Sequence, residues 1–438
     1  MLPSSHNSSL ATTRNTAVSV PALTATLTLA MGVSTLTQYS LGALGPFLTQ
    51  DLALSRVALG SLTTALFIIG GAFSLVAGPL VDRFGGRRLL LALFTIGATA
   101  TVAASAAPSF SFLLVAVALA GVTVALGNPV TNQLLAVYVE PGHQGLLVGI
   151  KQSGVQAGAF LAGATLPVLA GVFGWRGALL ASGLLAVIGI LAVVVTLPSP
   201  RRWSQSDANA WGADPATPVG PGASDAPATP VGPGAPDAPA ASTQLDGRLP
   251  TGVTWLAAYA VLMGIGVGVV TAYLPLYAVE ELGFTTAKGG SVAALVGLVG
   301  VAARIFWGRQ ADRAGAGVVT LLAWMAAAAV AGVALIWAGP ALGDWALWTG
   351  AVVYGMTAIA WNAVGMLALV RDIDVRLAGR ASGRVLLGFY GGFVVGPVGF
   401  GWTVDASGRY LFGWSLIIAT FVAATLLTLV WRSTRSPA

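Results

Sequence analysis

The feature that most constrains this chain is a series of long, continuous apolar stretches with almost no charged residues. Of its 438 residues, 56% are hydrophobic and only 8% are Asp, Glu, Lys or Arg, whereas about 25% charged residues is usual in a soluble domain. A helix that crosses a bilayer needs about 20 apolar residues. Because the stretches are continuous rather than alternating, they favour helices over a β-barrel. We therefore predict an all-α integral membrane protein.

The apolar stretches form two sets of six, separated by a polar segment. We predict an N-terminal six-helix bundle at residues 19–197 and a C-terminal six-helix bundle at residues 252–432. An even number of spans returns both chain ends to the same side of the membrane. The twelve predicted transmembrane helices are residues 19–47, 57–79, 88–107, 112–138, 145–171, 176–197, 252–279, 288–309, 316–338, 345–370, 381–405 and 410–432.

The segment between the two sets, residues 198–251, is rich in Pro, Gly and Ala. It contains A-T-P-V-G-P-G-A-S-D-A-P-A at 216–228 and an overlapping near copy at 228–240. Such repeats bury no apolar surface, so we predict a disordered cytoplasmic linker, with a binding role as the less favoured alternative. We also predict a disordered cytoplasmic N-terminus at 1–18 and a cytoplasmic tail at 433–438.

The net charge of +6 is explained by membrane topology rather than by nucleic-acid binding, because the arginines are spread among loops instead of gathered in one patch. Of the 21 Lys and Arg residues, 15 lie in predicted loops on one side and 4 on the other, while Lys151 and Arg304 lie inside predicted spans. Positive residues concentrate on the cytoplasmic side. We therefore predict a monomeric protein of the cytoplasmic membrane, with both termini and the linker in the cytoplasm.

The chain lacks the residues that several other classes of function require. There is no cysteine, and the two histidines, His6 and His143, lie in the polar N-terminus and a loop, so we expect no metal site and no cofactor. The chain has neither a G-x-S-x-G elbow nor a G-x-x-x-x-G-K-[ST] loop for ATP, which disfavours an enzyme and an ATP-driven pump. It also lacks the filter loop or charged ring of a channel.

A short Gly/Asp/Arg loop occurs twice, at residues 78–85 between spans 2 and 3 and at residues 308–315 between spans 8 and 9. Both copies fit G-x-x-x-D-R-x-G. The first glycine lets helix ends approach closely and the second permits a turn with positive φ. The Asp can face the positive end of a neighbouring helix, while the arginines pair across helices and bind headgroups. These properties predict a conformational latch made of Gly78, Asp82, Arg83, Gly85, Arg87, Arg88, Arg304, Gly308, Asp312 and Arg313.

With this repeated loop the chain resembles the major facilitator superfamily, whose signature is G-x-L-x-D-R-x-G-R-R/K. Gly86 departs from that pattern, which prefers Arg there. The resemblance covers all but the N-terminus, linker and tail. It implies two six-helix bundles, a solute site near the middle of the membrane, and alternating access by rocking of one bundle on the other.

Two further segments narrow the resemblance. G-I-K-Q-S-G-V at 149–155 and G-P-V-G-F-G at 396–401 are similar to the cyanate-permease-like group, which includes organic-anion and nitroimidazole carriers. The G-x-x-x-G-P-x-x-G-G motif of drug antiporters is absent from span 5. The favoured substrate is therefore a small organic anion, with drug or metabolite efflux and a receptor that binds without net flux as the alternatives.

Polar side chains inside spans are costly and are candidates for solute binding, although each could instead bond to a neighbouring helix. Asn128 and Asn132 are four residues apart and share a helix face. Span 5 also contains Gln156. The predicted solute-binding residues are Gln38, Tyr39, Asn128, Asn132, Lys151, Gln152, Tyr273, Trp361 and Asn362.

Two cations inside predicted spans matter most for the substrate. Lys151 either faces the central cavity, where it would attract a small anion, or extends to the inner headgroups. Arg304 lies four residues before Gly308 and is assigned to the second latch. Nitrate carriers of the superfamily use arginines in spans 2 and 8, and the absence of one in span 2 disfavours nitrate.

All carboxylates fall at predicted span ends or in loops. Proton-driven carriers commonly relay the proton through a carboxylate inside the membrane. We therefore predict uniport, exchange, or a mechanism in which the anionic solute itself travels with the proton.

Overall fold

The computed structural model describes residues 18–140, 144–198, 249–314, 317–372 and 375–434. Within these ranges every regular element is a helix. Nearly all of the predicted N-terminal segment, linker and tail lies outside the described residues, at 1–17, 199–248 and 435–438.

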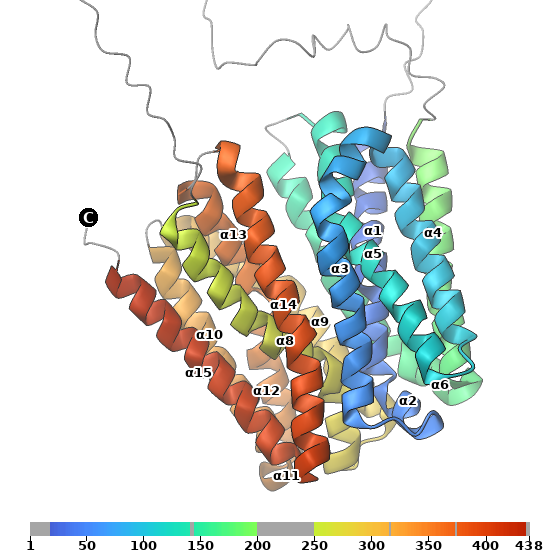
Figure 1. Cartoon of the computed structure of the whole chain (residues 1–438), viewed down its shortest axis with the longest axis vertical. Coiled ribbons are helices and arrows are strands. Elements are labelled where there is room, and N and C mark those ends of the chain that lie inside the picture. Colours follow the sequence, from blue (N-terminus) through green and yellow to red (C-terminus); the bar gives the residue numbers. More distant parts are fainter. Residues whose placement is uncertain (1–17, 141–143, 199–248, 315–316, 373–374, 435–438) are drawn as a thin grey trace, which may run out of the picture.

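The N-terminal half contains six membrane spans. One assigned helix supplies two of them, because Gly174 within it has φ 69° and ψ 165° and the chain turns there (Figure 1). The helices are α1 (Val20–Ala43), the short α2 (Gly45–Asp51), α3 (Arg56–Phe84), α4 (Gly86–Ser105), α5 (Phe110–Tyr138) and α6 (Gln144–Thr196).

The C-terminal half contains the other six spans. The tenth span, predicted at 345–370, is formed by α12 and α13 together and is interrupted by a turn at residues 358–360. The helices are α8 (Thr251–Leu282), α9 (Thr286–Ala314), α10 (Val318–Trp337), the short α11 (Gly339–Leu342), α12 (Asp344–Thr357), α13 (Trp361–Asp372), α14 (Val375–Ser407) and α15 (Tyr410–Thr434).

The predicted fold class is confirmed. Ten of the described helices are long and apolar enough to cross a membrane. Because α6 supplies two spans and the pair α12 and α13 supplies one more, the twelve predicted spans are all present.

Local sequence signals set several helix ends. The hydroxyl of Ser55 accepts a hydrogen bond from the N–H of Ala58 and caps α3, and Ser109 caps α5 in the same way through Phe112. Gly283, with φ 67°, ends α8 in the left-handed conformation that glycine tolerates best.

Two six-helix bundles lie side by side, α1 to α6 in one and α8 to α15 in the other (Figure 1). They meet at the lower end of the view and diverge at the upper end. The starts of α1 and α8 and the ends of α6 and α15 lie toward the upper end. We call the upper end the linker end and the lower end the outer end.

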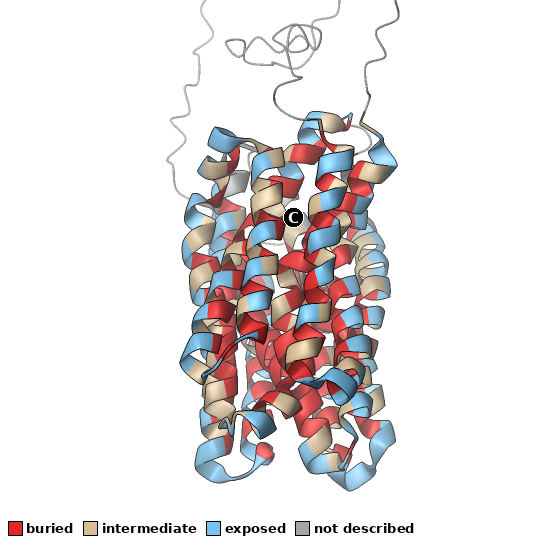
Figure 2. Ribbon diagram, turned by 90° about the vertical axis from the view of Figure 1, so that its right-hand side faces the viewer, coloured by how far each residue is buried: buried red, intermediate tan, exposed pale blue. Residues whose placement is uncertain are grey.

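The outside of the molecule is apolar. Leu75, Val115, Val172 and Val195 are 70–84% exposed, while buried residues gather inside the bundles (Figure 2). Apolar side chains on this scale are unfavourable in water and favourable in lipid. The exterior therefore fits a bilayer.

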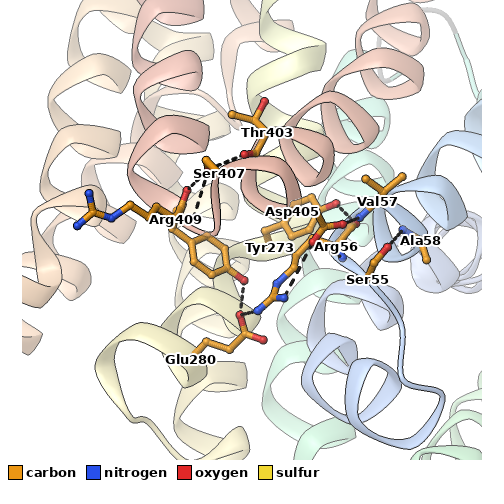
Figure 3. A network of polar contacts seen from close by, with 11 residues as sticks. Ser55, Arg56, Val57, Ala58, Tyr273, Glu280, Thr403, Asp405, Ser407 and Arg409 are labelled. Carbon is orange, nitrogen blue, oxygen red and sulfur yellow. Dashed lines mark hydrogen bonds and ion pairs between the residues drawn. The ribbon is translucent and has the colours of Figure 1, made fainter.

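A polar junction closes the outer end between the two bundles (Figure 3). The Arg56 guanidinium of α3 lies 2.9 Å from the Glu280 carboxylate of α8, which also accepts a hydrogen bond of 2.6 Å from the Tyr410 hydroxyl. Asp405 of α14 accepts the N–H groups of Arg56 and Val57 at 3.1 and 2.9 Å. A carboxylate of the C-terminal bundle thus binds the positive N-terminus of a helix in the N-terminal bundle.

Tyr273 belongs to this outer junction. Its hydroxyl lies 2.6 Å from the carbonyl oxygen of Arg56 and 2.9 Å from that of Pro397, and its side chain is fully buried. The sequence predicts Tyr273 as a solute-binding residue, whereas the structure places its hydroxyl between the start of α3 and the backbone of α14. Glycine permits the close approach here, since a Cβ at Gly60 or Gly401 would lie 2.5 Å from a carbonyl oxygen of the opposite bundle.

A second contact between the bundles runs along α6 and α9. Their backbones approach so closely that a Cβ at Gly163 would lie 2.5 Å from the Ala294 nitrogen, and one at Gly297 would lie 2.6 Å from the Phe160 nitrogen. The contact continues toward the linker end as far as Arg304. We call it the α6–α9 seam.

The bundles are apart beyond the seam. A Cβ at Gly78 or Gly308, the first glycines of the two predicted latches, would meet no atom within 4 Å. The close approach expected at these glycines is therefore absent in this conformation. The molecule is closed at the outer end and separated at the linker end.

Replacing Glu280 with Gln and Asp405 with Asn should weaken the outer junction. Each partly exposed charged contact contributes about 1 kcal/mol, so losing both should shift the balance toward an outer-open form roughly 30-fold. Because the chain has no cysteine, spin labels at Ala106→Cys and Ala406→Cys can report the distance between the outer ends. The double variant should add a longer-distance population.

The matched control for the outer junction is Glu281→Gln, which removes an adjacent exposed carboxylate that makes no ion pair among the described residues. Its distance distribution should equal that of the parent. An unchanged distribution in the double variant would show that the junction does not hold the outer end closed.

Gly163→Ala should destabilise the protein because its Cβ would overlap backbone atoms of α9, and overpacking of this kind costs about 1–3 kcal/mol. At Gly171, in the same helix, a Cβ meets nothing within 4 Å, so Gly171→Ala should be neutral or stabilising by up to about 1 kcal/mol. Thermal unfolding in detergent measures both. Equal melting temperatures for the two variants would contradict the close seam.

Candidate functional site

Arg304 lies where the α6–α9 seam ends. Its Nη1 donates to the carbonyl oxygen of Gln152 at 3.0 Å, and its Nε is buried with no hydrogen-bond partner in the described part of the chain. Gly300, Arg304 and Gly308 are spaced by four residues and share the face of α9 that meets α6. The sequence assigns Arg304 to the second latch, but the structure directs it one turn deeper, against the opposite bundle.

Uncharged polar groups surround this guanidinium. Tyr39 of α1 lies near both Arg304 and the side chain of Gln156 on α6. The Oε1 atom of Gln156 and the hydroxyl of Tyr354 on α12 are buried, and neither has a hydrogen-bond partner among the residues described. A Cβ at Gly300 would lie 2.9 Å from that Oε1. Arg304, Tyr39, Gln156 and Tyr354 form what we call the central cluster.

Several buried polar groups of the central cluster have no hydrogen-bond partner among the described residues. A buried polar group without a partner costs about 1–3 kcal/mol, and three such groups occur here: the Nε of Arg304, the Oε1 of Gln156 and the hydroxyl of Tyr354. They belong to three different helices drawn from both bundles. A molecule bound between the bundles can satisfy them only while it touches both halves.

A second polar group lies next to the central cluster, between α5 and α6. The Nε2 of Gln152 donates to the Oδ1 of Asn128 at 2.8 Å. Asn128 and Asn132 share a face of α5, as predicted from their spacing, and Asn132 is exposed. Gln152 joins the two groups, because its side chain binds Asn128 and its carbonyl oxygen binds Arg304.

Lys151 occupies neither of its two predicted positions. It is 0% exposed, so it does not reach the headgroups or line the cavity surface. Its Nζ donates to the Oγ1 of Thr131 and the Oδ1 of Asn132, both at 2.6 Å. The reason is the direction of its side chain, which enters the N-terminal bundle between α6 and α5. Lys151 lies directly behind Asn132.

The remaining predicted solute-binding residues lie elsewhere. Gln38 is buried in α1. Trp361 packs in an aromatic group within the C-terminal bundle, with ring centroids 5.7 Å from Tyr259 and 5.4 Å from Phe389. Asn362 follows it at the start of α13 and is partly exposed. Among the residues that the structure describes, no hydrogen bond or ring contact joins any of these three to the central cluster.

The first signature loop adopts the turn expected of its glycines. Gly85 has φ 80°. Gly86, which departs from the family pattern, fits because a Cβ there would lie 2.7 Å from Leu134. The Nε of Arg87 donates to the carbonyl oxygen of Leu197 at 3.1 Å, tying the loop to the end of α6.

The charged latch residues are largely unengaged in this conformation. Asp82, Arg83 and Arg88 are exposed, and Asp82 makes no hydrogen bond or ion pair within the described ranges. In the second copy, Arg313 contacts Gln310 at 3.4 Å. The side chain of Asp312 lies outside the described residues.

Two members of the central cluster are missing from the sequence-based set. Gln156 carries a usable signal, because it lies four residues from Gln152 and so shares its helix face. Tyr354 carries none, since a tyrosine in an apolar span is as easily a packing residue. The contact of Arg304 with α6 could have been inferred from the small residues on its face of α9.

Residues 27–383 match the family described as Major Facilitator Superfamily. Across 422 residues the chain is 27% identical to the probable nitrate/nitrite transporter NarK2 of Mycobacterium tuberculosis, covering 92% of this chain and 95% of that one. It is also 30% identical over 165 residues to the 4-hydroxybenzoate transporter PcaK of Pseudomonas aeruginosa, which is 37% of each protein.

Solved structures share the fold. The nucleoside transporter NupG aligns with a TM-score of 0.70 at 13% identity, covering 94% of this chain and all of that one. An inward-facing bacterial homologue of the human lysosomal transporter Spinster aligns with a TM-score of 0.69 at 16% identity, covering 96% and 100%. With two six-helix bundles, a repeated signature loop and a family match over most of its length, the chain belongs to the Major Facilitator Superfamily of membrane transporters.

Proposed function

We propose that this protein carries a small organic anion across the membrane and that Arg304 is its principal binding group. One observation carries the proposal: Arg304 and Lys151 lie inside the membrane-spanning region, and no carboxylate among the described residues pairs with either. The recorded ion pairs, such as Arg56 with Glu280, lie at the outer end.

The chemistry of the central cluster suits a carboxylate. A guanidinium presents several N–H donors in a planar fork and binds carboxylates in a bidentate manner. In Arg304 only the Nη1 contact to Gln152 has a recorded partner, and the Nε is free. The hydroxyls of Tyr39 and Tyr354 and the amide of Gln156 add neutral polar groups for the rest of the solute.

The relatives are named for anions, and these anions differ in size. NarK2 is named for nitrate and nitrite, and PcaK for 4-hydroxybenzoate. In α3 the arginines are at the two ends, Arg56 and Arg83, so the centre has one arginine from α9 and none from α3. A single guanidinium with neutral polar neighbours fits an organic monocarboxylate better than nitrate.

We further propose that transport uses alternating access. Along the α6–α9 seam, contacting residues pair in antiparallel register, Gly163 with Ala294 and Gln152 with Arg304. Extending this register by one turn brings Gly149 opposite Gly308. A Cβ at either glycine meets nothing within 4 Å in the present conformation. Closure of the linker end would bring these two glycines together while the outer junction opens.

The linker end is assigned to the cytoplasm, and the membrane to the cytoplasmic membrane. The excess of arginines in the loops of that end supports this orientation. Because the carboxylates of the described spans lie near the helix ends and none lies at the centre, we propose uniport, exchange, or co-transport in which the anion carries the proton.

Arg304→Gln should lower kcat/KM for anion uptake into proteoliposomes by roughly 10- to 100-fold, since a hydrogen bond to a charged group is worth about 1.5–3 kcal/mol. Arg304→Lys should keep part of the activity, because it retains charge but not the fork. The uptake panel is 4-hydroxybenzoate, gallate and nitrate. Arg432→Gln, at the exposed end of α15, is the matched control and should transport normally.

The uptake panel also separates the alternatives. Anion uptake that is unchanged in Arg304→Gln would contradict the proposed site. Flux of bulky hydrophobic compounds alone would indicate drug efflux, and Arg304-dependent binding without flux would indicate a receptor. Uptake of nitrate but of neither aromatic acid would replace the organic anion with an inorganic one.

The alternating-access proposal predicts a state-dependent disulfide between Gly149→Cys and Gly308→Cys. Such a bond needs Cα atoms within about 7 Å, so it should form under mild oxidation only when the linker end closes. It should form faster when Glu280→Gln and Asp405→Asn weaken the outer junction, and it should block uptake until reduced. Failure to cross-link in both backgrounds would contradict closure along this register.

A further inference from the structure

We infer that Lys151 is a positioning residue that fixes the orientation of the Asn132 amide and thereby makes Asn132 a hydrogen-bond donor toward carboxylates on the solute pathway. The inference rests on the proposed anion transport and extends it, because it assigns a selectivity role to a lysine that does not itself reach the solute.

The orientation of Asn132 follows from the chemistry of its partner. An amide side chain can turn either its oxygen or its nitrogen toward a neighbour, and the two atoms are hard to distinguish by shape alone. An ammonium has three donors and no acceptor. Because the Nζ of Lys151 lies 2.6 Å from Asn132, only the oxygen of the amide can face it. The NH₂ group of Asn132 is then the free end.

The free NH₂ group has access to the solute. Lys151 is 0% exposed, whereas Asn132 is exposed although it lies within the last two turns of the apolar helix α5. Asn132 shares its helix face with Asn128, which binds Gln152, the residue that also holds Arg304. The amide therefore lies on the linker-end side of the central cluster, where a solute from that side would pass.

Lys151 is also held so that it cannot turn outward. Its second contact, to the Oγ1 of Thr131, is 2.6 Å long, and Thr131 is 0% exposed and bonds to the Gly127 carbonyl oxygen of its own helix. In the described part of the chain no carboxylate lies against this ammonium. The positive charge of Lys151 therefore polarises the Asn132 amide and makes its NH₂ group a stronger hydrogen-bond donor.

The consequence is a preference for acids over their neutral amides. A donor NH₂ group binds the oxygens of a carboxylate, and Arg304 supplies the matching charge deeper in the pathway. If the amide of Asn132 could flip, its oxygen would face the solute and repel a carboxylate. Lys151 prevents the flip without occupying the pathway.

The test compares binding of matched acid and amide probes to the purified full-length protein by calorimetry. The pairs are 4-hydroxybenzoate with 4-hydroxybenzamide and lactate with lactamide. Lys151→Met should lower the ratio of acid to amide affinity at least 10-fold, mainly by weakening the acid. Ser153→Ala is the control, because the Ser153 hydroxyl bonds to the Ile150 carbonyl oxygen of its own helix, and it should retain the parent ratio.

Two further variants separate positioning from a general structural role. Asn132→Leu should lower the ratio as much as Lys151→Met, and the double variant should be no worse than either, because the lysine acts through the amide. Asn132→Asp keeps the contact with Lys151 but has no N–H donor, and it should also lose acid preference. This variant serves as the test if Lys151→Met fails to fold.

Each result has a defined meaning. Equal weakening of acid and amide in Lys151→Met, or additive losses in the double variant, would overturn the positioning role. If the parent prefers acids in an Arg304-dependent manner but Asn132→Asp leaves the ratio unchanged, only this inference fails. If the parent binds neither acids nor amides of either pair, the proposed anion transport fails with it.

Discussion

The close contact of the two bundles at the outer end is the interaction on which the rest of the structure depends. Asp405 of one bundle binds the first N–H groups of α3 in the other, and Arg56 at the same helix end binds Glu280. These groups attract one another only while the backbones are close, which the glycines at 60 and 401 allow. In this conformation, with the outer end closed, the helices at the opposite end are separated.

The chemistry of the centre follows from the cost of charge inside a membrane. A cation in this region is expensive unless it has partners. Lys151 obtains them from Thr131 and Asn132 within its own bundle. Arg304 obtains one from the Gln152 carbonyl oxygen and leaves its Nε free. The incompletely satisfied cation is the one at the boundary between the bundles, which is why we propose it as the anion-binding group.

The sequence predicts the spans well and the grouping of the polar side chains only in part. Helices α1 to α15 follow the predicted stretches, apart from the break at 358–360, which apolar composition does not signal. Asn128, Asn132 and Gln152 do come together, because spacing by four residues reveals a shared face. Tyr273 and Trp361 are both polar aromatic residues in apolar spans, so the sequence does not distinguish them. In the structure Tyr273 joins the outer junction, whereas Trp361 packs in an aromatic group.

By itself the sequence determined that this chain spans a membrane in two sets of six helices with a repeated loop. The sequence determines the spans because a membrane helix depends on local residues: each segment in hydrocarbon must pair its own backbone groups. Only the tertiary structure decided which polar side chains are shared between bundles and which are enclosed within one. Arg304 and Gln152 are 152 residues apart, and their contact depends on the rotation and approach of α6 and α9. The same geometry buried Lys151 behind Asn132, inside the N-terminal bundle, instead of at the boundary between the bundles.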